Sequence, residues 1–498
     1  MNRILGFLFM IFALSMASLA EDNRPNVLFI AIDDLNDWAG PFGGNPQCKT
    51  PNMDRFAEGG AVVFRNNHCA GPVCGPSRSA LLSGFMPNRT GVYGNSHYML
   101  QSPLVKTHAV LPEYFRKHGY YAASSGKIFH AHRFEDGPDR GQWSWDLHEG
   151  VGGRYEVDQS TLFSRRRGIL GGVTQENPKF ADPHGSEFGW AATKNPTEET
   201  GDYMTALWAV EQLKRDYDKP FFLGVGIFRP HLPWYAPQEF YDMYDLDTIE
   251  LPEVKEDDLD DILKPNGETK FKPSDDYLWM SQDEKIFKAG VRAYMANVTY
   301  ADHCLGVILD GLEMSGKADN TIVFIWGDHG WHLGEKMKFR KATIWSESTR
   351  APLMVRLPGM DELQFCDGAT SLIDMYPTLI ELCGLPEKEL DGRSFAPLLE
   401  DPARKWDYPV VTMQGPETAT VKYQEWRYTR YSDGTEELYD LGKDPMEHEN
   451  LIRSMTEKAV AMKRKLEKHF PKEWADELPR GASKVIDIRK SRDLESLR

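Results

Sequence analysis

Runs of consecutive apolar residues, rather than alternating ones, recur along this chain. They occupy residues 27–32, 221–227, 321–326 and 353–357. Continuous runs of this length are typical of strands that are buried on both faces of a sheet. Stretches with helical periodicity lie between them. The pattern therefore predicts an α/β sandwich with a large, mainly parallel sheet covered by helices.

Two of the intervening helices have recognisable ends. Thr50 and Pro51 predict a helix start, with Thr50 as the capping residue and Pro51 in the first turn. A longer helix is expected over about residues 291–314. Ser315-Gly316 follows it and is typical of a left-handed C-terminal cap.

The pattern changes after about residue 400. Short runs typical of strands follow at residues 409–413, 420–423, 427–431 and 437–439. The segment Ser432-Asp433-Gly434-Thr435 predicts a hairpin turn between the last two. A charged helix is expected over about residues 455–470. We therefore predict a small antiparallel sheet with one helix near the C-terminus.

The first twenty residues differ from the rest. Arg3 precedes an apolar run over residues 4–14, and Ser18-Leu19-Ala20 follows. This order is typical of a secretory signal peptide, with a buried helix as the alternative. No cysteine follows the run directly and no later run is long enough to span a bilayer, so we expect no membrane anchor. The expected protein is exported, periplasmic or secreted.

These patterns predict a division of the chain into three parts. Residues 1–20 would be the signal peptide and residues 21–400 the catalytic domain. Residues 401–498 would form a small C-terminal α+β subdomain and tail.

Charge and cysteine content narrow the class of protein. The chain has 75 Asp and Glu against 58 Lys and Arg, which gives a formal net charge of -17. This balance argues against nucleic acid as a partner, although a local group of cations can still bind an anionic substrate. The six cysteines match no zinc-binding spacing, and in an exported protein some of them can form disulfides.

Polar residues directly follow four of the expected strands. These are Asp33-Asp34 after residues 27–32, Gly126-Lys127 after 121–125, His231 after 221–227, and Gly327-Asp328-His329 after 321–326. In open α/β sheets, ligands bind beyond the carboxyl ends of the strands. We therefore expect the four clusters to meet in one site.

Asp33, Asp34 and Asp328 would face one another at this edge of the sheet. Carboxylates at close range repel one another unless a cation lies between them, and oxygen ligands favour calcium or magnesium. His329 is placed to complete the ligand shell. Taken singly, an aspartate after a strand is as often a helix cap, and a lone histidine is more often structural.

Cys74-Gly75-Pro76-Ser77-Arg78 is the most specific segment of the chain. Gly75 and Pro76 predict a tight turn into a short helix over residues 77–82, which Ser83-Gly84 would stop. Cys74 would then lie at a helix N-terminus, where the dipole and the free amides favour an anion. As a thiol it could be a nucleophile of lowered pKa, and a buried structural cysteine is the alternative.

This segment resembles the C-x-P-S-R signature of the type I, formylglycine-dependent sulfatases, in the alkaline-phosphatase-like superfamily. Its companions occur in that family's order, namely Asp33-Asp34, Gly126-Lys127 with His130, and Asp328-His329. The resemblance covers about residues 25–450. Residues 126–130, 229–233 and 328–331 are most similar to the iduronate-2-sulfatase branch. The resemblance implies an alkaline-phosphatase-like fold and hydrolysis of sulfate esters.

The resemblance also implies a modified nucleophile and a metal. A separate formylglycine-generating enzyme would oxidise Cys74 to formylglycine, whose hydrated form attacks sulfur. One calcium ion, Ca2+, would be held by Asp33, Asp34, Asp328, His329 and residue 74.

A sulfate ester spreads negative charge over its oxygens, so further cations should line the site. Arg78, Lys127 and Lys341 are the candidates. For any single lysine, a solvated surface charge is the alternative.

Two histidines are assigned to proton transfer. A sugar alkoxide is a poor leaving group, so a general acid must protonate it, and His231 is the candidate. His130 is the candidate base for the second step, in which a covalent sulfate intermediate breaks down.

The expected partner is a sulfated glycan in which the sulfated sugar lies beside a uronic acid, as in glycosaminoglycans and ulvan. Candidate glycan contacts are Arg165-Arg166-Arg167, Trp143, Trp145 and Trp234, for which a solvated loop and core packing are the alternatives. Two other functions compete with this one, a phosphatase or phosphonate hydrolase of the same superfamily and a non-catalytic protein that binds sulfated glycans. Cys74 and the small number of suitably placed histidines argue against the first. The presence of every matched catalytic position argues against the second.

Overall fold

The computed structural model describes residues 23–130, 144–150, 153–165, 168–170, 173–174 and 188–480. The expected signal peptide, Trp143, Arg166 and Arg167 lie outside these residues. Within the described part, none of the helices combines the length and the apolar character that a membrane span requires.

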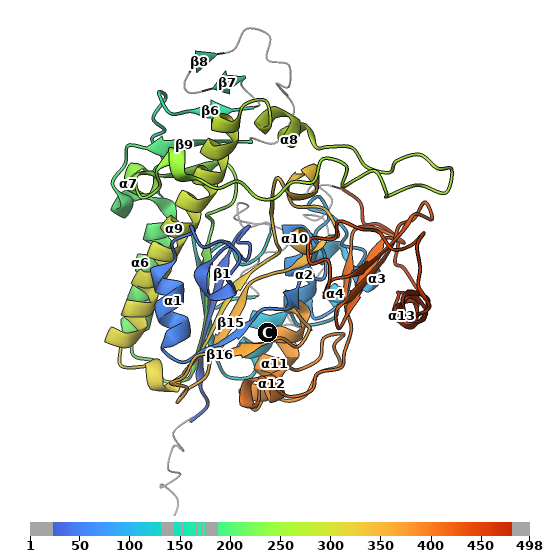
Figure 1. Ribbon diagram of the computed structural model, residues 1–498. Helices are drawn as coiled ribbons and strands as arrows, with labels where there is room; N and C mark the ends of the chain where they lie inside the picture. The colour runs from blue at the N-terminus through green and yellow to red at the C-terminus, as the bar shows by residue number, and fades with distance from the viewer. Residues whose placement is uncertain are drawn as a thin grey trace, which may run out of the picture.

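An eight-stranded sheet forms the centre of the molecule (Figure 1). In spatial order its strands are β16 (Gln364–Cys366), β2 (Val62–Phe64), β15 (Leu353–Arg356), β12 (Thr321–Gly327), β1 (Asn26–Ile32), β10 (Phe221–Ile227), β4 (Tyr121–Gly126) and β5 (Leu147–Glu149). The strands from β12 to β5 are parallel, whereas β15 runs antiparallel to both of its neighbours. The expected mainly parallel sheet is therefore confirmed, with β15 as an exception that its apolar run did not reveal.

Successive residues of β1 point into two different hydrophobic cores, which explains its unbroken apolar run. Leu28 and Ile30 pack with helices α1 (Pro51–Glu58), α6 (Gly201–Lys214) and α9 (Glu284–Met314). Val27 and Phe29 pack with α2 (Cys74–Ser83), α5 (Leu111–Lys117), α11 (Met375–Leu382) and α12 (Ala396–Glu400). Figure 1 shows these two helix layers on either side of the sheet, so the expected α/β sandwich is confirmed.

The helix ends differ in detail from the expectation. Helix α1 does begin at Pro51, but the Thr50 hydroxyl accepts a hydrogen bond from the backbone N–H of Gly40, at 2.8 Å, instead of capping the helix. Helix α9 begins at Glu284, well before residue 291, because the Asp283 side chain caps it there. Its expected end at Ser315-Gly316 is confirmed, and Gly316 has a φ of 68°.

A second sheet lies above the central sheet in Figure 1. Its order is β11 (Trp234–Pro237), β9 (Gly189–Thr193), β6 (Phe163–Ser164), β7 (Ile169–Leu170) and β8 (Val173–Thr174). Helix α8 (Asp275–Met280) lies near this sheet (Figure 1). The sequence did not predict this sheet, because its strands are short and carry no clear alternation.

The C-terminal part contains the expected antiparallel sheet. Its strands are β18 (Val410–Met413), β19 (Ala419–Tyr423), β20 (Trp426–Arg430) and β21 (Glu436–Asp440), in that spatial order. Helix α13 (Glu457–Glu467) packs on it, with Ala459 and Leu466 in a small core shared with Val421 and Tyr428 (red in Figure 1). The strands, the hairpin turn and the helix are confirmed, whereas the division at residue 400 stays a prediction.

Short helices and two short strand pairs also occur. The helices are α3 (Pro87–Thr90), α4 (Pro103–Lys106), α7 (Gln238–Asp242) and α10 (Ser346–Thr349), and the strands pair as β3 (Asn67–His68) with β17 (Thr370–Ser371) and β13 (His332–Leu333) with β14 (Phe339–Arg340).

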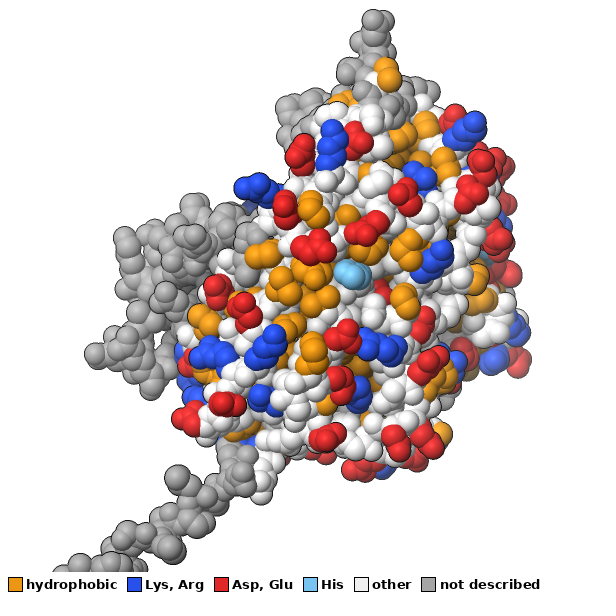
Figure 2. Space-filling model, turned by 90° about the vertical axis from the view of Figure 1, so that its left-hand side faces the viewer, with side chains coloured by type: hydrophobic (Ala, Val, Ile, Leu, Met, Phe, Trp, Pro, Cys, Tyr) orange, Lys and Arg blue, Asp and Glu red, His pale blue; other side chains and the backbone are white. Residues whose placement is uncertain are grey.

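Charges of both signs share the surface on the left-hand side of Figure 1. Figure 2 shows that face, where acidic and basic side chains alternate with small groups of hydrophobic ones. The basic side chains visible there form no continuous stripe. Basic side chains do gather in the interior of the molecule, at the ends of the central strands.

Candidate active site

The parallel strands β1, β4, β10 and β12 bring their carboxyl ends to one edge of the sheet, and the four polar clusters meet there. The backbone N–H of Asp33 donates to the Ile227 carbonyl oxygen at the end of β10, at 3.1 Å. The backbone N–H of Asp34 donates to Oδ1 of Asp328 after β12, at 3.1 Å. Both contacts join residues that are remote in sequence.

Asp34 has an unusual backbone and an unusual side chain. Its φ is 62°, in the left-handed region that non-glycine residues rarely occupy. Its Oδ2 atom is buried and has no hydrogen-bond partner within the described residues. Backbone strain of this kind concentrates at functional sites, and an unpaired buried carboxylate oxygen is a ready ligand for a cation.

Cys74 is the first residue of α2, so the helix begins three residues earlier than expected. Pro76 is tolerated inside it because the first N–H groups of a helix have no intrahelical acceptor. The backbone N–H of Gly75 donates instead to Oδ1 of Asn95, at 2.7 Å. The expected end of the helix is confirmed, since Gly84 adopts a φ of 78° there.

The Cys74 sulfur lies among charged groups from three other segments. Its Sγ atom is 3.0 Å from Nζ of Lys341, 3.4 Å from Nε2 of His329 and 3.8 Å from Oδ1 of Asp34. Burial alone would raise the pKa of this thiol, but the ammonium groups of Lys127 and Lys341 outweigh burial and lower it. Residue 74 is therefore placed to be a reactive anion rather than an inert buried cysteine.

Two groups of possible ligand atoms share residue 74. Asp33, Asp34, Cys74 and His231 form one group, and Cys74, Asp328 and His329 form the other. Within each group the ligand atoms lie within 4.8 Å of one another. Three of these six residues are aspartates, whose carboxylate oxygens suit a hard cation such as Ca2+, and the unpaired Oδ2 of Asp34 adds to that fit.

The protonation of these ligands reflects their crowding. Burial raises the pKa of Asp34 to about 7, although Lys341 opposes this. Burial would also raise the pKa of Asp33, but Lys127, His231, Arg78 and Lys341 together outweigh burial and hold that pKa well below its usual range. Burial would lower the pKa of His329, but Asp328 and Cys74 together outweigh burial and raise that pKa to about 9. The carboxylates of the site are thus paired with nearby ammonium and guanidinium groups, and a bound divalent cation would replace some of these contacts.

Arg78 lies behind the carboxylates and is fully buried. Its guanidinium donates to Asp328 Oδ2 at 2.8 Å, to Asp33 Oδ1 at 3.0 Å, and to the carbonyl oxygens of Lys127 and Ile128. Bidentate or forked contacts of this kind fix the orientation of carboxylates. The structure therefore places Arg78 against Asp33 and Asp328, two of the expected metal ligands.

Lys127 follows β4 through a turn that requires glycine. Gly126 has a φ of 73°, and a Cβ atom there would lie 2.0 Å from the Gly226 carbonyl oxygen. The turn directs Nζ of Lys127 to Oδ2 of Asp33, at 2.5 Å.

Lys341 lies on a strained segment between β14 and α10. Its neighbours Arg340 and Ala342 have φ values of 73° and 72°. Its Nζ atom contacts both Asp34 Oδ1 and Cys74 Sγ. Burial would lower the pKa of Lys341, but Asp34, Cys74, Asp33 and Asp328 together outweigh burial and raise that pKa, so the ammonium stays charged.

His231 lies in the turn after β10, with its side chain 26% exposed. Its Nδ1 atom lies 2.6 Å from the Leu232 carbonyl oxygen, so Nδ1 carries the hydrogen and donates it. Nε2 points toward Asp34 Oδ2, at 3.9 Å. Burial, Lys127 and Lys341 hold the pKa of His231 well below its usual range.

His130 lies outside both ligand groups. Its Nε2 atom donates to the Asn95 carbonyl oxygen at 3.0 Å, and the Asn95 side chain in turn accepts from Gly75. Asn95 thus links His130 to the start of α2. Sequence reasoning missed Asn95, because nothing in its neighbourhood signals a contact with residue 75. It also missed Tyr294, whose hydroxyl donates to the Asp34 carbonyl oxygen at 2.9 Å.

The candidate glycan contacts are not supported by the described residues among them. Trp145 and Trp234 are 2% and 0% exposed, so they pack in the core and cannot touch a polymer. Arg165 is also buried and donates to Asp276, at 3.0 Å. The two tryptophans add large apolar surfaces to the core, and burial of Arg165 is tolerated because Asp276 pairs with its charge.

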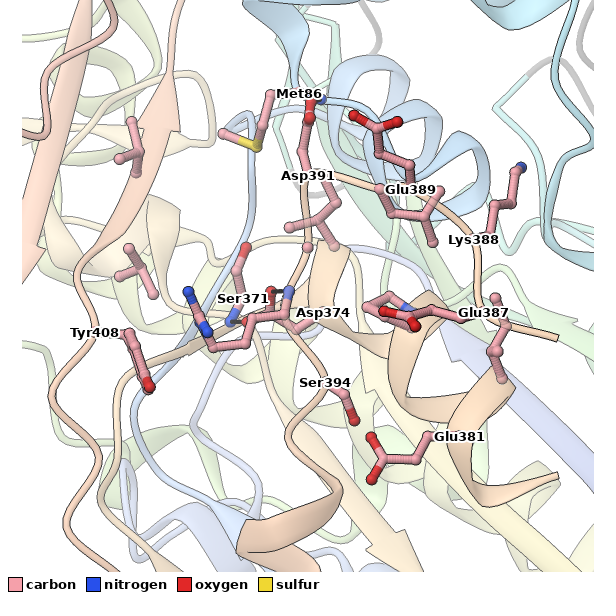
Figure 3. Close-up of a pocket in the computed structure, with 18 of the residues that line it drawn as sticks. Met86, Ser371, Asp374, Glu381, Glu387, Lys388, Glu389, Asp391, Ser394 and Tyr408 are labelled. Atoms are coloured by element: carbon pink, nitrogen blue, oxygen red, sulfur yellow. Dashed lines mark hydrogen bonds between the residues drawn. The ribbon is translucent and has the colours of Figure 1, made fainter. Parts of the chain in front are cut away.

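The large hollow in Figure 3 is separate from this site. It has a volume of about 1230 Å³, lies beside α11, and is lined by none of the candidate site residues described above. Four of the carboxylates that line it belong to Glu381, Glu387, Glu389 and Asp391. The lining also carries Lys388 and Arg393, but acidic side chains outnumber them and disfavour an anionic ester, so the hollow is a poorer place for sulfate chemistry than the Cys74 site.

Comparison with known proteins identifies the family. The family described as Sulfatase matches residues 25–385, and the family described as N-sulphoglucosamine sulphohydrolase, C-terminal, matches residues 327–473. A protein named Sulfatase from Formosa agariphila is 36% identical over 86% of this chain and 83% of its own length. Iduronate 2-sulfatase from Mus musculus is 29% identical over 75% of this chain and 72% of its own length.

A solved sulfatase structure shares the fold of this chain. The structure of a 2-O GAG sulfatase superimposes with a TM-score of 0.65 and 23% identity, over 94% of this chain and 94% of its own. This likeness agrees with the large mixed sheet and the small antiparallel sheet found here. The chain belongs to the sulfatase family and is a sulfuric ester hydrolase.

Proposed function

We propose that this sulfatase removes sulfate from sulfated glycans, with a formylglycine made from Cys74 as the nucleophile and Ca2+ as the metal. The observation that carries the proposal is the position of Cys74. It begins a helix, belongs to both groups of possible metal ligands, and lies 3.0 Å from the Lys341 ammonium. A helix N-terminus and a partly buried cation both stabilise an anion at this position.

Calcium would be held by Asp33, Asp34, Asp328, His329 and residue 74. When bound, it would stabilise the negative charge on the sulfate oxygens and on the attacking hydroxyl. Arg78 keeps Asp33 and Asp328 in place through its hydrogen bonds with both. We therefore propose Arg78 as a residue that positions the ligands, rather than as a direct contact of the sulfate.

Formylglycine would supply a hydroxyl nucleophile, in its hydrated form, at the place that the Cys74 sulfur marks. Lys127 and Lys341 approach this place from two different segments. Two ammonium groups held close to a sulfate ester stabilise the charge that develops on its oxygens. The formylglycine-generating enzyme is the partner that this maturation requires.

His231 is the proposed general acid. Its Nδ1–H donates to Leu232, so Nε2 is the atom that would hold the proton for the leaving alcohol. The free site keeps the ring neutral, and the negative charge of a bound sulfate ester favours the imidazolium. His130 is the proposed base for the second step, and its link to Gly75 through Asn95 keeps it near residue 74.

A sulfated glycan that contains uronic acid is the proposed substrate. The resemblance to iduronate 2-sulfatase supports this choice. Glycosaminoglycans and ulvan both offer such a sugar. The apolar N-terminal segment supports export, so we propose that the protein meets its substrate in the periplasm or outside the cell.

A panel of defined oligosaccharides tests the proposal. Sulfate release would be measured by ion chromatography from glycosaminoglycan and ulvan fragments, with 4-nitrophenyl phosphate as the counter-substrate. We expect sulfate to be released and phosphate to be released far more slowly. Phosphate release without sulfate release would instead support the phosphatase alternative.

A further inference from the structure

We infer that Arg229 and Asp202 are positioning residues that set the orientation of the His231 ring. The inference rests on the proposed role of His231 as general acid. Neither residue belongs to the metal-ligand groups, and neither is part of the catalytic set proposed above. Both act through the turn at residues 228–233, which connects β10 to β11.

The backbone of this turn determines where the His231 ring points. The backbone N–H of His231 donates to the Phe228 carbonyl oxygen at 3.0 Å, which closes the turn. Nδ1 of the ring donates to the next carbonyl oxygen, that of Leu232, at 2.6 Å. The Phe228 ring packs against the imidazole, with centroids 4.7 Å apart. The ring therefore follows any movement of the turn.

The buried side chain of Arg229 fixes the turn by hydrogen bonds to two carbonyl oxygens. Its Nη1 donates to the His231 carbonyl oxygen at 2.8 Å, and its Nε donates to the Tyr235 carbonyl oxygen at 2.9 Å. The guanidinium carbon lies 4.8 Å from the centre of the Tyr155 ring. Arg229 is 4% exposed, so both hydrogen bonds are shielded from water. One side chain thus ties the middle of the turn to β11.

Asp202 fixes the other side of the turn. It lies in the first turn of α6 and is 3% exposed. Its Oδ1 accepts from the backbone N–H of Phe228 at 2.7 Å, and its Oδ2 accepts from that of Arg229 at 3.0 Å. Hydrogen bonds to a charged acceptor are stronger than neutral ones, and these two leave neither amide unpaired. The carboxylate therefore fixes the point at which the chain leaves β10.

The two side chains bind four backbone groups, which are the N–H groups of Phe228 and Arg229 and the carbonyl oxygens of His231 and Tyr235. A shift of about 1 Å in a catalytic group can cost about a hundredfold in rate. Loss of either residue should therefore resemble a partial loss of His231. That loss should depend on the leaving group, because only a basic alkoxide needs the proton.

The test compares two substrates, 4-nitrophenyl sulfate and a heparin disaccharide that carries a uronate 2-sulfate. Nitrophenolate is a weak base and needs no acid, whereas the sugar alkoxide does. The variants are Arg229→Met, which removes both donors, Arg229→Lys, which keeps the charge and one donor, and Asp202→Asn. Arg215→Met is the matched control. Arg215 stacks on Tyr121 and donates a hydrogen bond to Oε1 of Gln212 near the C-terminal end of α6, away from the turn. The quantity compared is the ratio of kcat/KM on the two substrates, which partial unfolding leaves unchanged.

We expect Arg229→Met to lower kcat/KM on the disaccharide by about 10- to 100-fold and on 4-nitrophenyl sulfate by no more than about threefold. Arg229→Lys and Asp202→Asn should fall between Arg229→Met and the wild type, and Arg215→Met should match the wild type. Equal losses on both substrates in the Arg229 and Asp202 variants, with His231→Ala selective, would overturn the positioning role. If His231→Ala itself lost both activities equally, the proposed general acid would be wrong instead.

Discussion

The Nζ atom of Lys341 lies 3.0 Å from the Sγ atom of Cys74, although 267 positions separate the two residues in sequence. This contact places a partly buried ammonium group directly beside the proposed nucleophile. Lys341→Ala should lower kcat/KM by about 10²- to 10³-fold on every sulfate ester. The substitution removes a cation that stabilises the negative charge developing on the sulfate oxygens. Lys338→Ala is the matched control, since Lys338 lies three residues earlier in the chain and contacts the Lys272 carbonyl oxygen, away from Cys74. Activity should be normalised to the formylglycine content of each preparation, and equal activity of the two variants would contradict the prediction.

Maturation of Cys74 is directly measurable. Mass spectrometry of active protein should show a peptide in which residue 74 has lost its thiol and carries an aldehyde. Cys74→Ala should abolish turnover and leave the fold intact, because the small residue still fits a helix start. Full activity from protein with an intact thiol at this position would refute the mechanism.

Calcium binding should depend on the carboxylates at the strand ends. Asp33→Ala and Asp328→Ala should each remove bound calcium and lower activity by at least about 10³-fold, since the nucleophile is itself an expected ligand. Asp391→Asn is the control, because Asp391 is an acid of the separate hollow in Figure 3. Metal content would be measured by elemental mass spectrometry. Stoichiometric zinc, with activity restored by zinc alone, would support the phosphatase alternative.

The two histidines should separate by substrate. His231→Ala should lower kcat/KM by about 10²- to 10⁴-fold on a sulfated sugar and much less on an activated aryl sulfate. His130→Ala should be slow on both substrates, because the second step, in which the covalent sulfate intermediate breaks down, is common to every substrate. Parallel losses on both substrates in both variants would show that the roles are assigned wrongly.

His332 should make stability depend on pH. Burial lowers the pKa of His332 to about 3 in the folded protein, against about 6.5 for an unfolded chain. The unfolded state therefore binds the extra proton between these values, and the free energy of unfolding falls as the pH is lowered from about 6.5 to about 3. Within this window the loss is up to about 1.4 kcal/mol per pH unit.

His332→Asn isolates this effect. Asn keeps a donor for the Glu335 carbonyl oxygen but cannot titrate, and it loses the bond with Thr343. At pH 8 the variant should be about 1 kcal/mol less stable than the wild type in urea unfolding. At pH 5 the difference should shrink or reverse. An identical difference at both pH values would show that His332 does not titrate as expected.

The sequence by itself determined the layers of the fold and the composition of the site. Unbroken apolar runs such as residues 27–32 require two covered faces, and both β1 neighbours are parallel as expected. Parallel strands end at one edge, so Asp33 and Asp328 had to lie near each other. The segment from Cys74 to Arg78 indicated the nucleophile, because its residues are contiguous and can be recognised without the fold.

The tertiary structure alone decided which way each side chain faces. No local sequence pattern predicts three of these features. They are the direction of β15, the position of Arg78 behind the carboxylates, and the hydrogen bond from Arg229 to the His231 turn. Each depends on contacts between segments that are far apart in sequence, or on which of several carbonyl oxygens a long side chain can reach. Local periodicity reports burial and element type, whereas such contacts exist only once the chain has packed. The same reason explains why Lys341 was recognisable as a cation, while its contact with Cys74 appeared only in the folded protein.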